Sequence, residues 1–182
     1  MYDGTSIKLE EVNNFEQKLL KHGKILTLKP KEDSINSFFL ERGHNVEHLK
    51  LDSHSNGEIY EATAKESIIK TMRGLKDKER FIGIWALDTL LHLDRLDLYY
   101  VLNKFYQVLV EKGLLYLSFR FGEKDYFKEG RWITCFTEKE LMDLVGFTDF
   151  DILEMSNKDD YINVILKVRF LVSLFLSIIF FS

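Results

Sequence analysis

The sequence predicts one α/β domain built around a mostly parallel β-sheet, and three observations lead to this class. Apolar runs typical of buried strands alternate along the chain with segments of helical periodicity, as in proteins whose helices connect parallel strands. The 182 residues match the size of one domain, and 46% of them are hydrophobic, which is enough for a sizeable core. The single proline argues against a loop-rich all-β protein.

The N-terminal half is predicted to begin with a helix and to continue with strands and helices. Apolar residues recur at three- and four-residue steps over residues 12–20, so we expect an amphipathic helix there. Gly43 suits the left-handed end of a later helix. The further elements expected in this half are a strand at 25–28, a helix at 35–42, strands at 46–51, 67–72 and 81–86, and a helix at 58–65.

The C-terminal half contains the clearest helical pattern in the chain. Five apolar residues share one face of a helix expected over residues 95–111, and the run 114–119 is apolar on both faces, as a central parallel strand requires. Thr137 followed by Glu140 forms a capping-box pattern for a helix that reaches Val145. The strands expected at 147–155 and 161–168 are joined by so short a connection that they must form an antiparallel hairpin.

The charge of the chain bears on which partners it can bind, and its cysteine content bears on its cellular compartment. The net charge of −4 and the absence of a strongly basic stretch give no expectation of nucleic-acid binding. Cys135 is the only cysteine and cannot form an intramolecular disulfide, and no apolar signal-like stretch follows Met1. We therefore expect a reducing, cytoplasmic compartment.

No metal ion is expected. His48 and Asp52 share one face of the strand predicted at 46–51 and its continuation. Four residues of a strand separate them by about 13 Å. Ligand bonds near 2 Å are too short for one ion to reach both.

Several segments resemble class I S-adenosylmethionine-dependent methyltransferases, nearest to the small tellurite-resistance-type branch. The resemblance spans about residues 12–168. It rests on Phe81-Ile82-Gly83-Ile84-Trp85-Ala86 with Leu90-Leu91-His92-Leu93, on Gly113-Leu114-Leu115-Tyr116-Leu117-Ser118-Phe119, and on Gly130-Arg131-Trp132-Ile133-Thr134 before Phe136-Thr137-Glu138-Lys139-Glu140-Leu141. It implies a doubly wound, Rossmann-like sheet of seven strands that is mostly parallel and ends in a C-terminal antiparallel hairpin. The implied cofactor is S-adenosylmethionine, and the implied partner is a small-molecule substrate.

The segments that bind the cofactor in this family depart from its pattern here. Aligned without a gap, the acid of the family's first strand falls on Thr27, and its three glycines fall on Lys29, Lys31 and Asp33. The family's carboxylate that accepts the ribose hydroxyls falls on Lys50, which cannot accept a hydrogen bond. If the strand is shifted, Asp52 could take this role instead. The motif for S-adenosylmethionine is therefore degenerate, and we expect cofactor binding to be impaired.

The remaining candidate site residues follow the strand at 81–86. Ala86, Leu87 and Asp88 are expected to form a wall of the cofactor pocket, because open parallel sheets bind ligands beyond the carboxyl ends of their strands. The resemblance places His92 beside the transferred methyl group and Arg131 over the substrate opening. His92 is a candidate base or a packing residue, and Arg131 is a candidate anion ligand or a solvated side chain. No catalytic residue is assigned.

The chain divides into a methyltransferase-like domain at residues 1–168 and an apolar tail at residues 169–182, which lies outside the family pattern. From Phe170 onward the tail carries no charge. Thirteen helical residues reach about 20 Å, which is less than the roughly 30 Å hydrocarbon core of a bilayer. A peripheral membrane anchor, an added strand, an oligomer contact and an extended or shifted reading frame are the alternatives for it.

Two functions are compatible with these features. The first is an S-adenosylmethionine-dependent methyltransferase with weakened cofactor binding that acts on a small molecule. The alternative is a non-catalytic protein of the same fold: a pseudoenzyme, a subunit that supports a partner, or the product of a decaying gene. The sequence assigns neither an oligomeric state nor a substrate.

Overall fold

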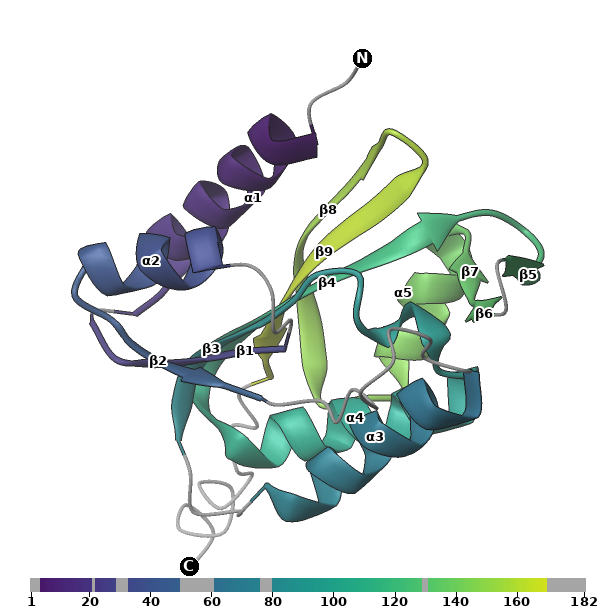
Figure 1. Cartoon of the computed structure of the whole chain (residues 1–182), viewed down its shortest axis with the longest axis horizontal. Coiled ribbons are helices and arrows are strands. Elements are labelled where there is room, and N and C mark those ends of the chain that lie inside the picture. The colour runs from purple at the N-terminus through teal and green to yellow at the C-terminus, as the bar shows by residue number, and fades with distance from the viewer. Residues whose placement is uncertain are drawn as a thin grey trace, which may run out of the picture.

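The computed structural model describes residues 4–20, 22–28, 33–49, 61–75, 80–128 and 131–169. They form three layers, with helices on both faces of a twisted β-sheet (Figure 1). Helices α1 and α2 lie on one face of the sheet, whereas α3 and α4 lie on the other (Figure 1). The helices are α1 (Gly4–Lys18), α2 (Asp33–Glu41), α3 (Glu61–Gly74), α4 (Arg95–Val108) and α5 (Glu138–Gly146).

The main sheet has the strand order β2-β1-β3-β4-β9-β8, and the short strand β7 also pairs with β4. Strands β2, β1, β3 and β4 are mutually parallel, whereas β9 runs antiparallel to both β4 and β8. The strands of this sheet are β1 (Lys24–Thr27), β2 (Asn45–His48), β3 (Phe81–Ala86), β4 (Leu109–Phe121), β7 (Cys135–Phe136), β8 (Phe150–Lys158) and β9 (Tyr161–Val168). A separate antiparallel pair is formed by β5 (Tyr126–Lys128) and β6 (Arg131–Ile133). The predicted fold, a mostly parallel sheet with a C-terminal antiparallel hairpin, is confirmed.

Apolar side chains of the sheet pack into one cluster on each face. The larger cluster joins α3, α4 and α5 to the sheet, and Leu102, Phe105 and Val145 are among its buried members. The smaller cluster lies under α1 and α2, where Phe15 and Phe39 pack on Trp85. Both clusters are needed to remove the two apolar faces of a mostly parallel sheet from water.

Local signals explain where several elements begin and turn. The Thr137 hydroxyl accepts the backbone N–H of Glu140, and the Glu140 carboxylate accepts the N–H of Thr137, so the predicted capping box is confirmed. Asp159 and Asp160 have φ values of 53° and 63° and join β8 to β9. Two consecutive residues with positive φ form the tight turn that matches the twist of an antiparallel hairpin.

The strand predicted at 67–72 is wrong, because this segment belongs to α3. Ile68, Met72 and Leu75 are all buried and follow each other at i, i+4 and i+7, which is a helical spacing. The main sheet reaches seven strands with β7 rather than with this segment.

The helix predicted at 95–111 ends earlier, at Val108, and β4 begins directly with Leu109. Leu109 is buried and adopts an extended backbone with ψ of 148°. Pairing of this residue with Phe81 of β3 therefore replaces the last helical turn that the sequence pattern suggested.

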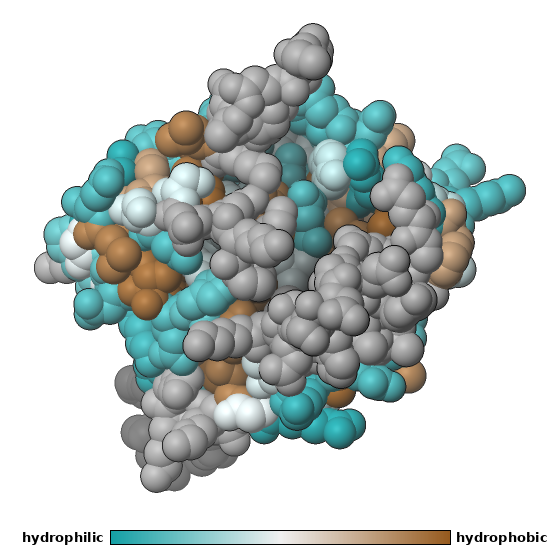
Figure 2. All heavy atoms as spheres, in the orientation of Figure 1, coloured by the Kyte–Doolittle hydropathy of each residue, from teal (hydrophilic) through white to brown (hydrophobic). Residues whose placement is uncertain are grey.

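The visible surface of the α1 and α2 side has small hydrophobic patches among hydrophilic ones (Figure 2). Leu9 and Leu40 are the exposed aliphatic residues of α1 and α2 in the part whose burial is described. None of the helices in the described ranges is long and apolar enough to cross a bilayer.

Candidate functional site

The crevice where this fold can bind a ligand lies at the carboxyl ends of β1 and β3. The chain leaves β1 through α2 on one face of the sheet and leaves β3 through α4 on the other face (Figure 1). Such a reversal separates the two connections and opens a crevice between neighbouring parallel strands. Leu28 continues β1 by donating its N–H to the Trp85 carbonyl at 3.0 Å, and Leu87 follows β3. Both leucines are buried, Leu28 in the cluster on the α3 and α4 side and Leu87 in the cluster under α1 and α2, so this edge of the sheet is apolar.

One row of paired residues crosses the sheet just below this edge. Its members face α1 and α2 and are paired in the order His48, Thr27, Trp85, Tyr116 and Ile165. Trp85 and Tyr116 stack with ring centroids 3.9 Å apart and an interplanar angle of 10°. The indole N–H of Trp85 is buried and has no hydrogen-bond partner within the described ranges.

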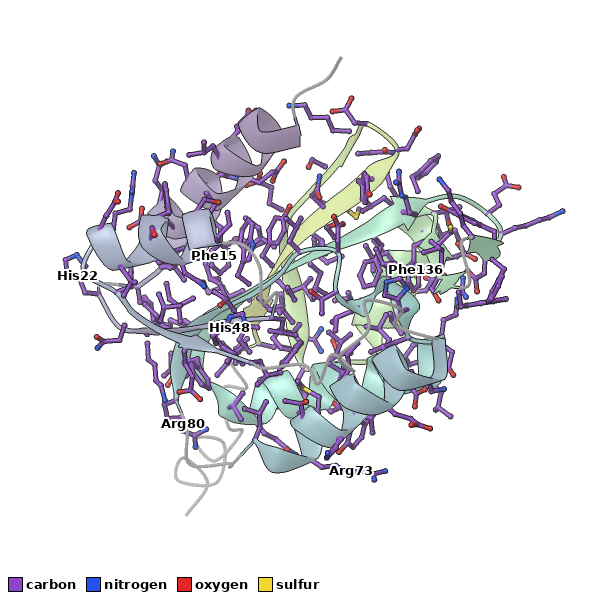
Figure 3. All side chains as sticks on the ribbon, in the orientation of Figure 1. Phe15, His22, His48, Arg73, Arg80 and Phe136 are labelled. Carbon is purple, nitrogen blue, oxygen red and sulfur yellow. The ribbon has the colours of Figure 1, made fainter. Side chains whose placement is uncertain are left out.

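The β1 and β2 end of this row is a small polar network. The Thr27 hydroxyl lies 2.9 Å from Asn36 Oδ1 and 2.9 Å from His48 Nδ1. Because a hydroxyl has one proton, Thr27 donates to Asn36 and accepts from the Nδ1–H of His48. Thr27 is 2% exposed, so both bonds are shielded from water. In Figure 3, His48 lies near the middle of the view.

The β3 and β4 end of the crevice carries a carboxylate. Asp88 lies two residues after β3 and has a φ of 51°, in the left-handed region that aspartate tolerates better than most residues. Its Oδ1 accepts a 2.7 Å hydrogen bond from the buried Ser118 hydroxyl on β4. The neighbouring backbone is held by a 2.9 Å bond from the Thr89 hydroxyl to the Leu87 carbonyl. Asp88 itself is half-buried, so its carboxylate borders both protein and solvent.

Two further polar groups adjoin Asp88 on the same side of the sheet. The Tyr116 hydroxyl donates to Asn163 Oδ1 at 3.0 Å, and both residues are buried. Burial raises the pKa of Tyr116, and the negative charges of Glu11 and Asp88 raise it further. The phenol is therefore a neutral hydrogen-bond donor at physiological pH.

Helix α1 covers this side of the sheet. Phe15 lies between α1 and the sheet (Figure 3) and packs edge-on against Trp85 and Tyr116, with ring centroids 5.4 and 6.2 Å away. On the next helical turn, Glu11 is half-buried, and this burial raises the pKa of its carboxyl, as does the charge of Glu10.

Strand β8 and the hairpin hold α1 in place. Glu154 of β8 accepts a 2.8 Å hydrogen bond from Asn14 and forms a 2.9 Å ion pair with Lys18. The hydrogen bond from Lys18 lowers the pKa of Glu154. Near the hairpin turn, Lys158 pairs with Glu10 at 3.2 Å.

The structure brings some of the predicted site residues together and not others. Ala86 and Leu87 are buried at the end of β3 beside Asp88, and their role as a wall of a cofactor pocket stays a prediction. His92 belongs to a short 3-10 helix, and its Nδ1 donates to the Trp132 carbonyl at 2.9 Å. This bond fixes β6 against the end of the 3-10 helix. Arg131 begins β6, but its side chain lies outside the described part, as does Asp52.

Sequence reasoning missed three polar residues at this site: Ser118, Tyr116 and Asn163. Each lies inside a strand whose pattern is dominated by apolar residues, so nothing distinguished them from tolerated core residues. A serine and an asparagine within otherwise apolar central strands were the available signal, because buried polar groups need partners.

Cys135 is a free cysteine in β7. It is buried, and this burial raises the pKa of its thiol. Its backbone N–H donates to Asp125, which also pairs with Arg95 at 2.8 Å.

The described part of the chain contains no group of three histidine, cysteine, aspartate or glutamate side chains arranged for a metal ion.

Neither a family model nor a curated protein matches the chain, whereas solved structures do. The Burkholderia thailandensis 1,6-didemethyltoxoflavin-N1-methyltransferase, solved with 1,6-didemethyltoxoflavin and S-adenosylhomocysteine, is 18% identical. Its TM-score is 0.69 over 88% of this chain and 77% of its own. The glycopeptide N-methyltransferase MtfA in complex with S-adenosylmethionine is 13% identical, with a TM-score of 0.56 over 86% of this chain and 85% of its own.

The N-methyltransferase NodS of Bradyrhizobium japonicum is 11% identical, with a TM-score of 0.59 over 93% of this chain and its entire own length. Identities this low establish a shared fold and nothing finer. The chain therefore has the α/β, Rossmann-like fold of class I S-adenosylmethionine-dependent methyltransferases.

Proposed function

We propose that this protein is an S-adenosylmethionine-dependent methyltransferase that acts on a small molecule and binds its cofactor weakly. The observation that carries the proposal is the reversal of the connections between β1 and β3, with Asp88 held by Ser118 just beyond the end of β3. Solved proteins of the same fold contain S-adenosylmethionine or S-adenosylhomocysteine, and one of them also contains its small-molecule substrate.

The residues of the crevice fit the cofactor in part. Leu28 and Leu87 make this edge of the sheet apolar, and Asp88 supplies a polar group beside it. At the ends of β1 and β2, however, the described residues include no carboxylate that could take ribose hydroxyls. Thr27 is already bonded to both Asn36 and His48. The fit therefore supports a cofactor that is held by shape and apolar contact more than by charge.

When bound, S-adenosylmethionine supplies a methyl group on a sulfonium, which is a strong electrophile. The chain itself needs to position an acceptor and keep water away. Leu87 and Trp85 belong to the buried cluster under α1, where Phe15 packs on Trp85 and keeps water from this side of the sheet. Asp88 presents a hydrogen-bond acceptor whose direction Ser118 fixes.

The expected loss of cofactor affinity follows from the replaced anchors. An absent charge-assisted hydrogen bond costs roughly 1.5–3 kcal/mol. Two losses of about 2 kcal/mol each amount to nearly a thousandfold in affinity, at about 1.4 kcal/mol per tenfold. The replacements at Lys29, Lys31 and Lys50 lie outside the described residues, as does Asp52, which would offset one loss if β2 continued with a shift of two residues.

A non-catalytic role is the second candidate, and one observation favours it. The network of Thr27, Asn36 and His48 is complete without a ligand and ties β1, α2 and β2 together. A complete network at the ends of β1 and β2 would leave a stable scaffold for a partner protein.

Titration calorimetry with S-adenosylhomocysteine tests the proposal. We expect saturable binding in the millimolar range, about −4 kcal/mol, accompanied by amide resonance shifts at Leu87 and Asp88. Micromolar affinity would contradict the weakened binding and indicate a fully competent methyltransferase. Absence of saturable binding, or shifts confined to the opposite edge of the sheet near Arg80, would support the non-catalytic alternative. Leu96→Ala is the matched control, because Leu96 is 79% exposed and lies on α4.

A further inference from the structure

The carboxylate of Asp88 is held in a fixed position and forms no ion pair with the residues that the structure describes. Its backbone is in the left-handed region, a conformation that costs a non-glycine residue free energy and persists where surrounding structure holds it. Ser118 bonds to Oδ1, and within the described ranges Oδ2 has no hydrogen-bond partner. No lysine or arginine in those ranges forms an ion pair with Asp88. One carboxylate oxygen is therefore left for a ligand.

The surroundings of Asp88 favour a donor or a cation over an anion. The charge of Asp88 contributes to raising the pKa of both Tyr116 and Tyr161, after burial, so both rings lie within its electrostatic reach. Glu11 adds a second negative charge near Tyr116. Arg120, whose charge acts on Tyr161 in the opposite sense, lies over the Tyr161 ring, 4.0 Å from its centroid.

We propose that Asp88 binds a basic nitrogen of the ligand, so that the molecule taken by this crevice is an amine. A protonated amine or an N–H group would donate to Oδ2 while Ser118 holds Oδ1 in place. An acceptor with a carboxylate at this position would meet Asp88 and Glu11 with like charge. An alcohol would donate one hydrogen bond to the carboxylate but, carrying no charge of its own, would lack the ion-pair attraction that a protonated amine adds.

This inference rests on the proposed function only for the role of the amine as methyl acceptor, in which the amine would first give up its proton to water and then use the freed lone pair for the new N–C bond as the sulfonium C–S bond breaks. The binding site itself follows from Asp88 and Ser118 alone. Methyltransferases of the same fold include three whose acceptor is described as nitrogen, which agrees with an amine here.

Three probes of the same shape test the proposal: benzylamine, benzyl alcohol and benzoate. Their binding to the full chain is measured by ligand-observed NMR at pH 7. We expect benzylamine to bind most tightly and benzoate least. Asp88→Asn keeps the size of the side chain and its bond from Ser118 but removes the charge, and it should weaken benzylamine binding at least tenfold while leaving benzyl alcohol within twofold. Glu66→Gln is the matched control, because Glu66 is an exposed carboxylate on α3, on the other face of the sheet.

The outcomes separate this inference from the proposed function. Equal binding of benzylamine to the wild type and to Asp88→Asn, or a preference of the wild type for benzoate, overturns the amine site. If Asp88→Asn fails to fold, the order of the three probes on the wild type decides the question. S-adenosylhomocysteine is titrated into the same samples. Benzylamine binding that depends on Asp88, without any S-adenosylhomocysteine binding, keeps the amine site and removes the methyltransferase function. S-adenosylhomocysteine binding without benzylamine binding that depends on Asp88 removes the amine site alone.

Discussion

Helix α1 should be part of the cooperative core, and Phe15→Ala tests this. Phe15 is fully buried, and its ring contacts those of Trp85, Tyr116 and Phe39 with centroids 5.4, 6.2 and 6.3 Å away. Truncating a buried phenylalanine costs about 3–5 kcal/mol, from lost transfer free energy and the cavity left behind. Three edge-on aromatic contacts place the expected cost in the upper part of this range.

Urea denaturation followed by far-UV circular dichroism measures the loss, and a thermal scan should show the midpoint lowered by roughly 6–20 °C. Leu9→Ala is the control on the same helix, because Leu9 is 56% exposed and should change the free energy of unfolding by less than about 0.5 kcal/mol. A loss below about 1 kcal/mol for Phe15→Ala would refute the reasoning, since α1 would then be a peripheral element.

Gly83 of β3 gives an independent check of the same interface. A Cβ at this position would lie 2.7 Å from Leu19 Cδ2 and 3.0 Å from Phe15 Cζ, both side-chain atoms of the α1 region. Gly83→Ala should therefore destabilise the wild type by pushing α1 outward, but less so in the Phe15→Ala background, where the ring is gone. The expected coupling is about 0.5–3 kcal/mol. Equal costs of Gly83→Ala in both backgrounds would contradict the expected coupling and leave Leu19, the closer neighbour, as the source of the cost.

Three further predictions concern other parts of the chain. Thr137→Ala removes the cap of α5 and should lower the free energy of unfolding by about 1 kcal/mol, whereas Thr137→Ser should retain most of it, as measured by urea denaturation. Because burial raises the pKa of Glu11 in the folded chain, its contribution to stability is complete below the ordinary value of 4.5 and is lost as the pH rises through the higher folded value. Glu11→Gln should therefore raise stability at neutral pH and flatten this part of the stability–pH curve, and an unchanged curve would contradict the burial. A chain ending at Arg169 should keep its cooperative thermal transition and be more soluble, since β9 ends at Val168 and the removed residues are uncharged and apolar; loss of the transition would show that the tail belongs to the core.

Long apolar patterns and local turn chemistry made most of the elements predictable. The strand at Phe81–Ala86, the capping box at Thr137 and the C-terminal hairpin each follow from a signal contained in a few consecutive residues. The segment 67–72 was mistaken for a strand because a short apolar run fits both the strand period and the helix period. Only the packing of α3, to which it belongs, against α4 shows that it is helical.

Only those parts of the candidate site that are formed by consecutive residues were predictable from the sequence. Ala86, Leu87 and Asp88 were expected at the end of a strand, and the structure has them there. The bond from Ser118 to Asp88 joins residues 30 positions apart, and no local pattern encodes such a distance.

The sequence by itself determined the class of fold and the mostly parallel sheet, because alternation and periodicity are properties of the chain. The tertiary structure alone decided which polar groups meet at Thr27 and which hydroxyl holds the Asp88 carboxylate. Strand pairing set His48, Thr27, Trp85 and Tyr116 in one row, and the packing of α2 brought Asn36 to the Thr27 hydroxyl. The physical reason is that hydrogen bonds between distant residues form only once the burial of both sheet faces has fixed the strand order.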